Sequence, residues 1–117
     1  MVKKVLFLYP NPSTIDYEHS LINRVSFTQI KTVPEVMALF ENDGLTEYDL
    51  IMVTVMRPFQ NIGTPGLTRR ICEIYQGPIL VVSANRDFRN LIKESGADHE
   101  AKSPEEAQKK ITELLEL

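Results

Sequence analysis

Residues 49–58, with the sequence DLIMVTVMRP, decide the fold of this chain. The run at 50–55 is apolar or β-branched throughout, and Arg57 and Pro58 close it. Because the apolar residues do not alternate with polar ones, the pattern predicts a strand that helices cover on both faces. Thr54 carries the hydroxyl group within this run, and we expect that hydroxyl to form a local hydrogen bond.

Further strands are predicted on both sides of this stretch. The runs at 5–9 (VLFLY) and 79–84 (ILVVSA) have the same character and predict two more buried strands. The run at 25–30 (VSFTQI) mixes polar and apolar side chains, which is typical of a half-exposed edge strand. Residues 97–101 (ADHEA) predict a weak and polar fifth strand.

Helices with recognisable start signals lie between and after these strands. Each signal is a Ser, Thr, Asn or Asp cap, in several cases with a proline or glutamate soon after it. The predicted cap residues are Thr32, Thr64, Asn85 or Asp87, and Ser103. Glycines at 44, 77 and 96 are expected to end three of the helices. A further helix around residues 13–23 has a thinner apolar stripe.

The alternation of strands and helices predicts the fold class. It favours an α/β fold in three layers, a flavodoxin-like (βα)5 unit whose five parallel strands take the order 2-1-3-4-5. The chain has 117 residues, close to the commonest domain size, so we expect residues 1–117 to form a single, free-standing domain. The sequence shows no internal repeat and no linker.

Composition excludes several functional classes. The net charge is −3 with acidic and basic residues interspersed, so no basic patch indicates nucleic acid. No apolar run has the length that a membrane span requires. Cys72 is the single cysteine, which excludes an internal disulfide or a zinc finger and favours a reducing cytoplasm. We expect Cys72 to be a partly buried residue of the third helix.

The fold prediction locates a candidate site. In open parallel sheets, ligands bind beyond the carboxyl ends of the strands, at the point where the strand order reverses. The residues expected there include Tyr9, Pro10, Thr54, Ser83 and Lys102. A magnesium or phosphoryl site would need carboxylates, and this set has none. The turn after the first strand (YPNPST) also lacks the glycines of a dinucleotide site.

Several motifs together resemble the receiver domain of bacterial two-component response regulators. They are DLI…MRP at 49–58, GL…RRI in the third helix, PILVVSA at 78–84, GAD at 96–98 and SPEEA at 103–107. Their order and spacing match over nearly the whole chain, and the match is weakest between residues 11 and 33. The resemblance implies a cytoplasmic signalling function.

The resemblance also implies where the functional residues of that family would fall. The pair of magnesium-binding acids after the first strand corresponds to Tyr9 and Pro10, and the phosphate-accepting aspartate corresponds to Thr54. The hydroxyl residue that ends the fourth strand corresponds to Ser83, and the lysine after the fifth corresponds to Lys102. Three carboxylates are therefore replaced, while the last two positions are kept.

These replacements predict a pseudo-receiver, in which the fold is kept and the acid pocket is lost. Phosphoryl transfer needs charge compensation that a metal largely supplies. A hydroxyl is a poorer nucleophile than a carboxylate unless a base activates it. We therefore expect no catalytic residue, no metal, no cofactor and no enzymatic activity. The aromatic residue of the fifth strand, which changes rotamer in the family, is replaced here by Glu100.

Partner contacts are expected in two places. The loop FQNIGT is a few residues longer than is usual in the family, and we expect it to expose apolar side chains to a partner. Its contact residues would be Phe59, Gln60, Asn61 and Ile62. The other place is the face made by the fourth helix, the fifth strand and the fifth helix, which this family commonly uses. The expected partner is another signalling protein or a second copy of this chain, with neither nucleic acid nor a membrane involved.

Two alternative functions remain open on the sequence. One is a regulator with non-standard phosphorylation of Thr54 or Ser83. The other is a flavodoxin-like domain that binds a small molecule, since a fold does not fix a function. Arg57, at the rim of the site, is expected to form a salt bridge, with anion binding as the alternative.

Overall fold

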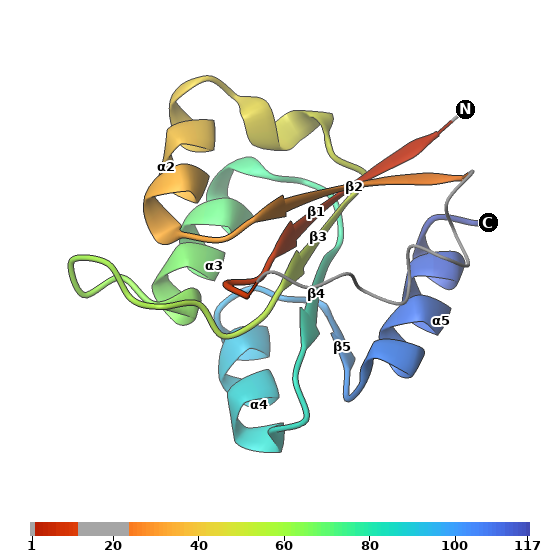
Figure 1. Ribbon diagram of the computed structural model, residues 1–117. Coiled ribbons are helices and arrows are strands. Elements are labelled where there is room, and N and C mark those ends of the chain that lie inside the picture. Colours follow the sequence, from red (N-terminus) through yellow and green to blue (C-terminus); the bar gives the residue numbers. More distant parts are fainter. Residues whose placement is uncertain (1, 12–23) are drawn as a thin grey trace.

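The computed structural model describes residues 2–11 and 24–117, and its centre is a parallel sheet. The strands are β1 (Lys3–Leu8), β2 (Val25–Ile30), β3 (Leu50–Val53), β4 (Ile79–Val82) and β5 (His99–Ala101). They take the order β2-β1-β3-β4-β5, and every neighbouring pair is parallel (Figure 1). The predicted fold class and strand order are confirmed.

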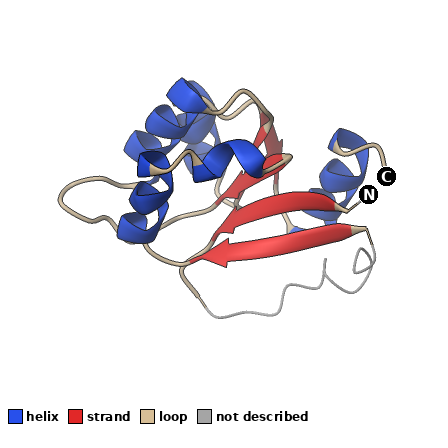
Figure 2. Ribbon diagram, turned by 90° about the horizontal axis from the view of Figure 1, so that it is seen from above, coloured by secondary structure: helices blue, strands red, loops and turns tan. Residues whose placement is uncertain are grey.

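Helices cover both faces of the sheet. The described helices are α2 (Val33–Glu41), the 3-10 turn η1 (Gly44–Glu47), α3 (Thr64–Ile74), α4 (Arg86–Glu94) and α5 (Pro104–Leu114). Helices α2, α3 and α4 lie on one face, and α5 lies on the other (Figures 1 and 2). The helix predicted around residues 13–23 lies outside the described residues.

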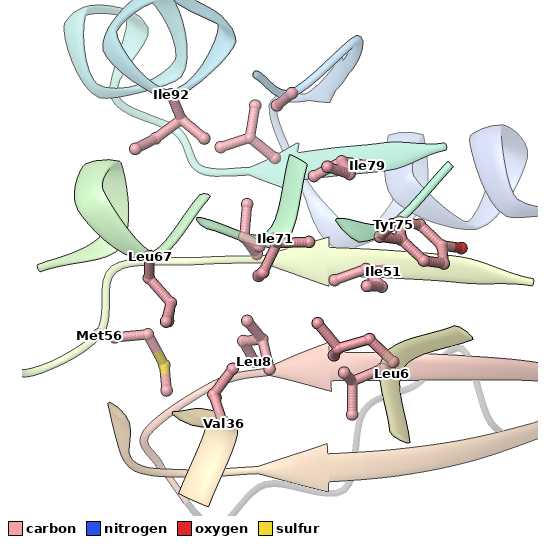
Figure 3. Close-up of a cluster of buried hydrophobic side chains, with 14 of the residues drawn as sticks. Leu6, Leu8, Val36, Ile51, Met56, Leu67, Ile71, Tyr75, Ile79 and Ile92 are labelled. Atoms are coloured by element: carbon pink, nitrogen blue, oxygen red, sulfur yellow. The ribbon is translucent and has the colours of Figure 1, made fainter. Parts of the chain in front are cut away.

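Two hydrophobic clusters follow from the alternation of side chains along each strand. In β1, Leu6 and Leu8 point into the cluster under α2, α3 and α4, whereas Val5 and Phe7 point into the cluster under α5. Figure 3 shows Val36, Leu67, Ile71 and Ile92 from the three helices converging on the strand residues of the first cluster. Both faces of β3 are therefore buried, as its unbroken apolar run predicted.

The predicted caps are confirmed at three helices and wrong at one. The side chains of Thr32, Asn85 and Ser103 accept hydrogen bonds from backbone N–H groups in the first turns of α2, α4 and α5. Helix α3 instead begins after Gly63, and the hydroxyl of Thr64 makes no cap bond. That hydroxyl bonds instead to the backbone of Thr54 and Met56.

The expected partial burial of Cys72 is also wrong, because its side chain is exposed on α3. The buried residues of that helix are Thr64, Leu67, Thr68 and Ile71, and they define a stripe that leaves Cys72 outside. Among the described residues, no helix combines the length and the apolar character that crossing a bilayer requires.

Candidate functional site

Thr54 lies directly after β3, at the carboxyl edge of the sheet, and is 8% exposed. Its backbone N–H donates to the carbonyl oxygen of Leu8 at 3.2 Å, and its hydroxyl donates to the same oxygen at 2.8 Å. The predicted local hydrogen bond is therefore wrong, since Leu8 is 46 positions away in the sequence, on β1. The side chain of Thr54 ties two central strands together.

A neutral hydrogen-bond network extends from Thr54 into α3. The hydroxyl of Thr64 donates to the carbonyl oxygen of Thr54 at 2.9 Å and accepts from the backbone N–H of Met56 at 2.9 Å. The hydroxyl of Thr68 donates to the carbonyl oxygen of Thr64 at 2.7 Å. All three threonines are buried, and the network includes no ionisable side chain. We call Thr54, Thr64 and Thr68 the threonine network.

Sequence reasoning missed two members of this network. The sequence pattern predicts a helix cap at Thr64 and indicates no role for Thr68. The available signal was their spacing, because hydroxyl residues at positions i and i+4 share one face of a helix. Leu67 and Ile71 lie on the same face and are buried, so the two hydroxyls need partners inside the protein.

Tyr9 and Pro10 follow β1 at the same edge of the sheet. Because Leu8 pairs with Val53, Tyr9 and Thr54 leave their strands at the same level. The ring of Tyr9 stacks on Phe7, with 5.2 Å between the ring centroids, and packs against the cluster under α5. The side-chain amide of Gln29 donates to the carbonyl oxygens of Tyr9 and Asn11 at 3.0 and 2.7 Å, which fixes this segment to β2.

Ser83 directly follows β4 and caps the next turn. Its hydroxyl oxygen accepts from the backbone N–H of Asn85 at 3.1 Å. Lys102 follows β5 and is exposed. Within the described part of the chain, no hydrogen bond or ion pair joins Ser83, Lys102 and Thr54 to one another. The structure places the predicted residues along one edge without linking them into a constellation.

A buried guanidinium connects α4 with β4 and β5. Arg89 is 5% exposed, and its Nε donates to Oε1 of Glu100 at 2.9 Å while a terminal nitrogen donates to the carbonyl oxygen of Ser83 at 2.9 Å. The ammonium of Lys93 donates to Oε2 of Glu100 at 2.6 Å. Hydrogen bonds from Lys93 and then Arg89 hold the pKa of Glu100 below its usual value. No sequence motif predicts this three-residue group, which we call the Arg89 clamp.

The loop after β3 forms a small hairpin that extends away from the rest of the molecule (Figure 1). Phe59 and Ile62 exchange two backbone hydrogen bonds, of 3.0 and 2.9 Å. Between them Gln60 and Asn61 have φ values of 50° and 66°, which is the backbone of a type I′ turn. Phe59 is 42% exposed, whereas Ile62 is half-buried against the first cluster, so the expectation that both are exposed holds for Phe59 only.

Two surface hollows are present at the ends of the described elements. A groove of about 630 Å³ lies between the segment after β1, the start of α2 and the loop after β3. A second hollow, of about 390 Å³, lies between α4, β5 and α5 and is lined by charged residues of both signs. Among residues 2–11 and 24–117, no three His, Cys, Asp or Glu side chains gather as a metal site would require.

The threonine network can hold the sheet edge together, and it offers no acid or base to a substrate. A hydroxyl needs an adjacent base to act as a nucleophile. The hydroxyl of Thr54 donates to a backbone carbonyl instead. Arg57 is exposed at the rim, and no described carboxylate pairs with it, so the salt bridge expected there is not formed with any described residue.

Solved structures of known proteins share the fold of this chain. No family model and no curated protein matches this sequence. Among solved structures, the BeF3-activated DrrB receiver domain aligns over 100% of both chains with a TM-score of 0.75 and 17% identity. The receiver domain of the Francisella response regulator 1452 aligns over 97% of both chains with a TM-score of 0.74 and 18% identity.

A response regulator from Thermotoga maritima aligns over 100% of both chains with a TM-score of 0.73 and 16% identity. Identities this low establish likeness of fold and leave the chemistry of the site to be argued from its own residues. The predicted resemblance to receiver domains is confirmed at the level of structure. This chain has the fold of the receiver domains of response regulators.

Proposed function

We propose that this chain is a receiver-like module that accepts no phosphoryl group and acts by binding another protein. The observation that carries the proposal is the threonine network. The resemblance to receiver domains puts the phosphate-accepting aspartate at the position of Thr54. Here that position holds a buried hydroxyl that bonds to the carbonyl oxygen of Leu8.

The chemistry at Thr54 supports this proposal. Transfer of a phosphoryl group needs an oriented nucleophile and cations that neutralise the developing charge. The hydroxyl of Thr54 has no titratable partner among the described residues, and Tyr9 and Pro10 offer no carboxylate for a magnesium ion. Ser83 is half-buried, and its hydroxyl oxygen accepts a hydrogen bond from the backbone N–H of Asn85. No described base contacts it.

The Arg89 clamp supports a module with one fixed conformation. In the receiver family the residue at the position of Glu100 is an aromatic side chain that changes rotamer. In this chain the carboxylate of Glu100 is held by Arg89 and Lys93 at 2.9 and 2.6 Å. Rotation of the Glu100 side chain would break its charge-assisted hydrogen bonds to both cations. An aromatic ring at this position would lose no such bonds on rotation.

Binding is the output that we propose for such a module, with no enzymatic activity, metal or cofactor. The proposed contact surfaces are the hairpin at residues 59–62 and the face made by α4, β5 and α5. The partner would be another signalling protein or a second copy of this chain, and neither nucleic acid nor a membrane. A cytoplasmic location is part of the proposal, because Cys72 is the single cysteine and is exposed as a free thiol.

The proposal is tested by phosphorylation from a small donor. The protein is incubated with acetyl phosphate and Mg²⁺ and its intact mass is recorded, alongside a standard receiver domain as the positive control. Amide NMR spectra are recorded during titration with Mg²⁺ and beryllofluoride. We expect no mass gain and no saturable shifts near Thr54 and Ser83.

A gain of one phosphoryl group would overturn the proposal. The variants Thr54→Val and Ser83→Ala would then locate the phosphoryl group. Only the variant that lacks the phosphorylated hydroxyl would show no mass gain. Retention of the gain in both variants would assign the modification to another residue, and that result would also contradict a non-phosphorylatable module.

A further inference from the structure

The groove of about 630 Å³ is a surface that the proposed loss of phosphorylation does not explain. It lies at the carboxyl edge of the sheet, beside the threonine network, and Thr54, Ser83 and Lys102 do not line it. Its walls come from three separate segments of the chain. The lining residues are Pro10, Asn11, Lys31, Thr32, Val33, Pro34, Arg57, Pro58 and Phe59.

Much of the wall of this groove is apolar, and its three prolines have little conformational freedom. Pro10, Pro34 and Pro58 have fixed φ angles and offer no backbone N–H group. Phe59 is 42% exposed and is held in place by its paired backbone bonds to Ile62. A preformed apolar wall reduces the ordering cost of binding, which favours a docking function.

The charge of the groove is opposite to that of the whole chain. Lys31 and Arg57 are both exposed and stand on different walls, and neither forms an ion pair or hydrogen bond with a described residue. None of the nine lining residues is acidic, although the chain carries a net charge of −3. Glu35, in the first turn of α2, bonds to the hydroxyl of Thr32 at 2.7 Å and does not line the groove.

We infer that this groove docks a short acidic segment of a partner protein, in which carboxylates alternate with leucine or aromatic side chains. The carboxylates would meet Lys31 and Arg57, and the apolar side chains would lie on the prolines and Phe59. A peptide fits better than a small metabolite, because the groove extends to Phe59, whose side chain is largely exposed. Phe59 belongs to a hairpin that protrudes from the molecule (Figure 1). The inference rests on the proposed function, since it names the chemistry of the protein partner.

The test uses the full chain and a defined set of probe peptides. Acetylated and amidated hexapeptides that contain two glutamates and two leucine or phenylalanine residues in every order are screened, with glutamine-for-glutamate versions as neutral controls. The dissociation constant of the best acidic peptide is then measured at low and at high salt. We expect the acidic peptides to bind, the neutral ones to lose affinity, and salt to weaken the binding.

Two charge-matched double variants test the location. Lys31→Gln with Arg57→Gln removes both groove cations, and we expect it to weaken binding about fivefold or more. Arg70→Gln with Lys109→Gln removes two exposed cations that do not line the groove, and we expect little change. Phe59→Ser should weaken binding without changing its salt dependence. Thermal unfolding of each variant confirms that it is folded.

Several results would overturn the inference. One is equal binding of acidic and neutral peptides, and another is an equal loss of peptide affinity in the two double variants. A third is a set of amide NMR shifts, on addition of the peptide, that map to α4, β5 and α5. Phenylacetate binding as tightly as the best peptide would also overturn it, in favour of a small carboxylate ligand. If acetyl phosphate phosphorylates the protein and the peptide still binds at the groove, only the proposed function is contradicted. If the protein is not phosphorylated and no peptide binds, only the inference that the groove docks an acidic segment is contradicted.

Discussion

The hydroxyl of Thr54 and the carbonyl oxygen of Leu8 are joined by a hydrogen bond of 2.8 Å between the two central strands. The same oxygen also accepts the backbone N–H of Thr54. Leu8 therefore keeps one hydrogen-bond donor if the hydroxyl is removed. Thr64 is different, because its hydroxyl serves both the carbonyl oxygen of Thr54 and the N–H of Met56.

This difference predicts an order of stability among valine variants. Thr54→Val should lower the free energy of unfolding by about 1 kcal/mol, since one hydrogen bond is lost and no buried group is left unpaired. Thr64→Val should cost about 2 to 4 kcal/mol, since it leaves a buried donor and a buried acceptor without their partner. Urea unfolding measures both, with Thr28→Val, at an exposed position of β2, as the control. Equal losses at 54 and 64 would contradict the network.

The Arg89 clamp predicts a pH dependence of stability. Because Lys93 and Arg89 lower the pKa of Glu100 in the folded state from its ordinary value of 4.5, the ionised carboxylate stabilises the fold above that pH. The contribution is lost as the pH falls below about 4.5 toward the lowered pKa of the folded state. Glu100→Gln should therefore be less stable than the native protein at neutral pH, and the difference should shrink in acid.

Chemical denaturation of the two proteins across the acid range gives this difference directly. Glu73→Gln, at an exposed position of α3, is the matched control for the loss of one carboxylate. A constant difference between the native protein and Glu100→Gln at every pH would mean that ionisation of Glu100 does not contribute. Replacing Arg89 and Glu100 together by methionine should cost less than replacing Glu100 alone, because no unpaired buried charge remains.

Gly96 and Gly66 predict opposite effects of alanine. Gly96 has a φ of +133°, and an added Cβ would lie 3.0 Å from both Cβ and Sγ of Cys72. Gly96→Ala should therefore destabilise the protein by about 1 to 3 kcal/mol. Gly66 lies inside α3 with only Ile62 nearby, at 3.8 Å, so Gly66→Ala should stabilise by about 0.5 to 1 kcal/mol. Thermal unfolding distinguishes the two, and a shift of the same sign in both would contradict this account.

Tyr75 predicts a loss of stability at alkaline pH. Burial, with smaller contributions from Asp49 and Asp98, raises the pKa of Tyr75 well above its usual value, and its hydroxyl donates to the carbonyl oxygen of Tyr48 at 3.0 Å. In the unfolded chain the tyrosine side chain ionises near pH 10. The contribution of Tyr75 to the stability of the fold should therefore be fully present below that pH and fall above it. Tyr75→Phe should show a flatter alkaline dependence in denaturation experiments. An unchanged slope would show that other groups cause the loss.

The sequence by itself determined the elements and their order. The unbroken apolar runs at 50–55 and 79–84 indicated strands buried on both faces, and Thr32, Asn85 and Ser103 marked the starts of three helices. These signals are local, because strand periodicity and helix capping depend on residues a few positions apart. Right-handed crossovers between parallel strands then left few topologies, and five strands in a chain of this length favoured the flavodoxin-like order 2-1-3-4-5. The receiver-like motifs agreed with it.

Only the tertiary structure decided what the polar side chains do. Thr54 could have bonded locally, and Thr64 could have capped α3. The register of β1 against β3 instead brings the hydroxyl of Thr54 to Leu8, and the packing of α3 against the end of β3 brings the hydroxyl of Thr64 to Thr54 and Met56. The burial of Arg89 against Glu100 likewise joins residues of separate elements, and Lys31 and Arg57 come from separate segments to line one groove. Such partners depend on how far apart elements pack, and no short stretch of sequence encodes that distance.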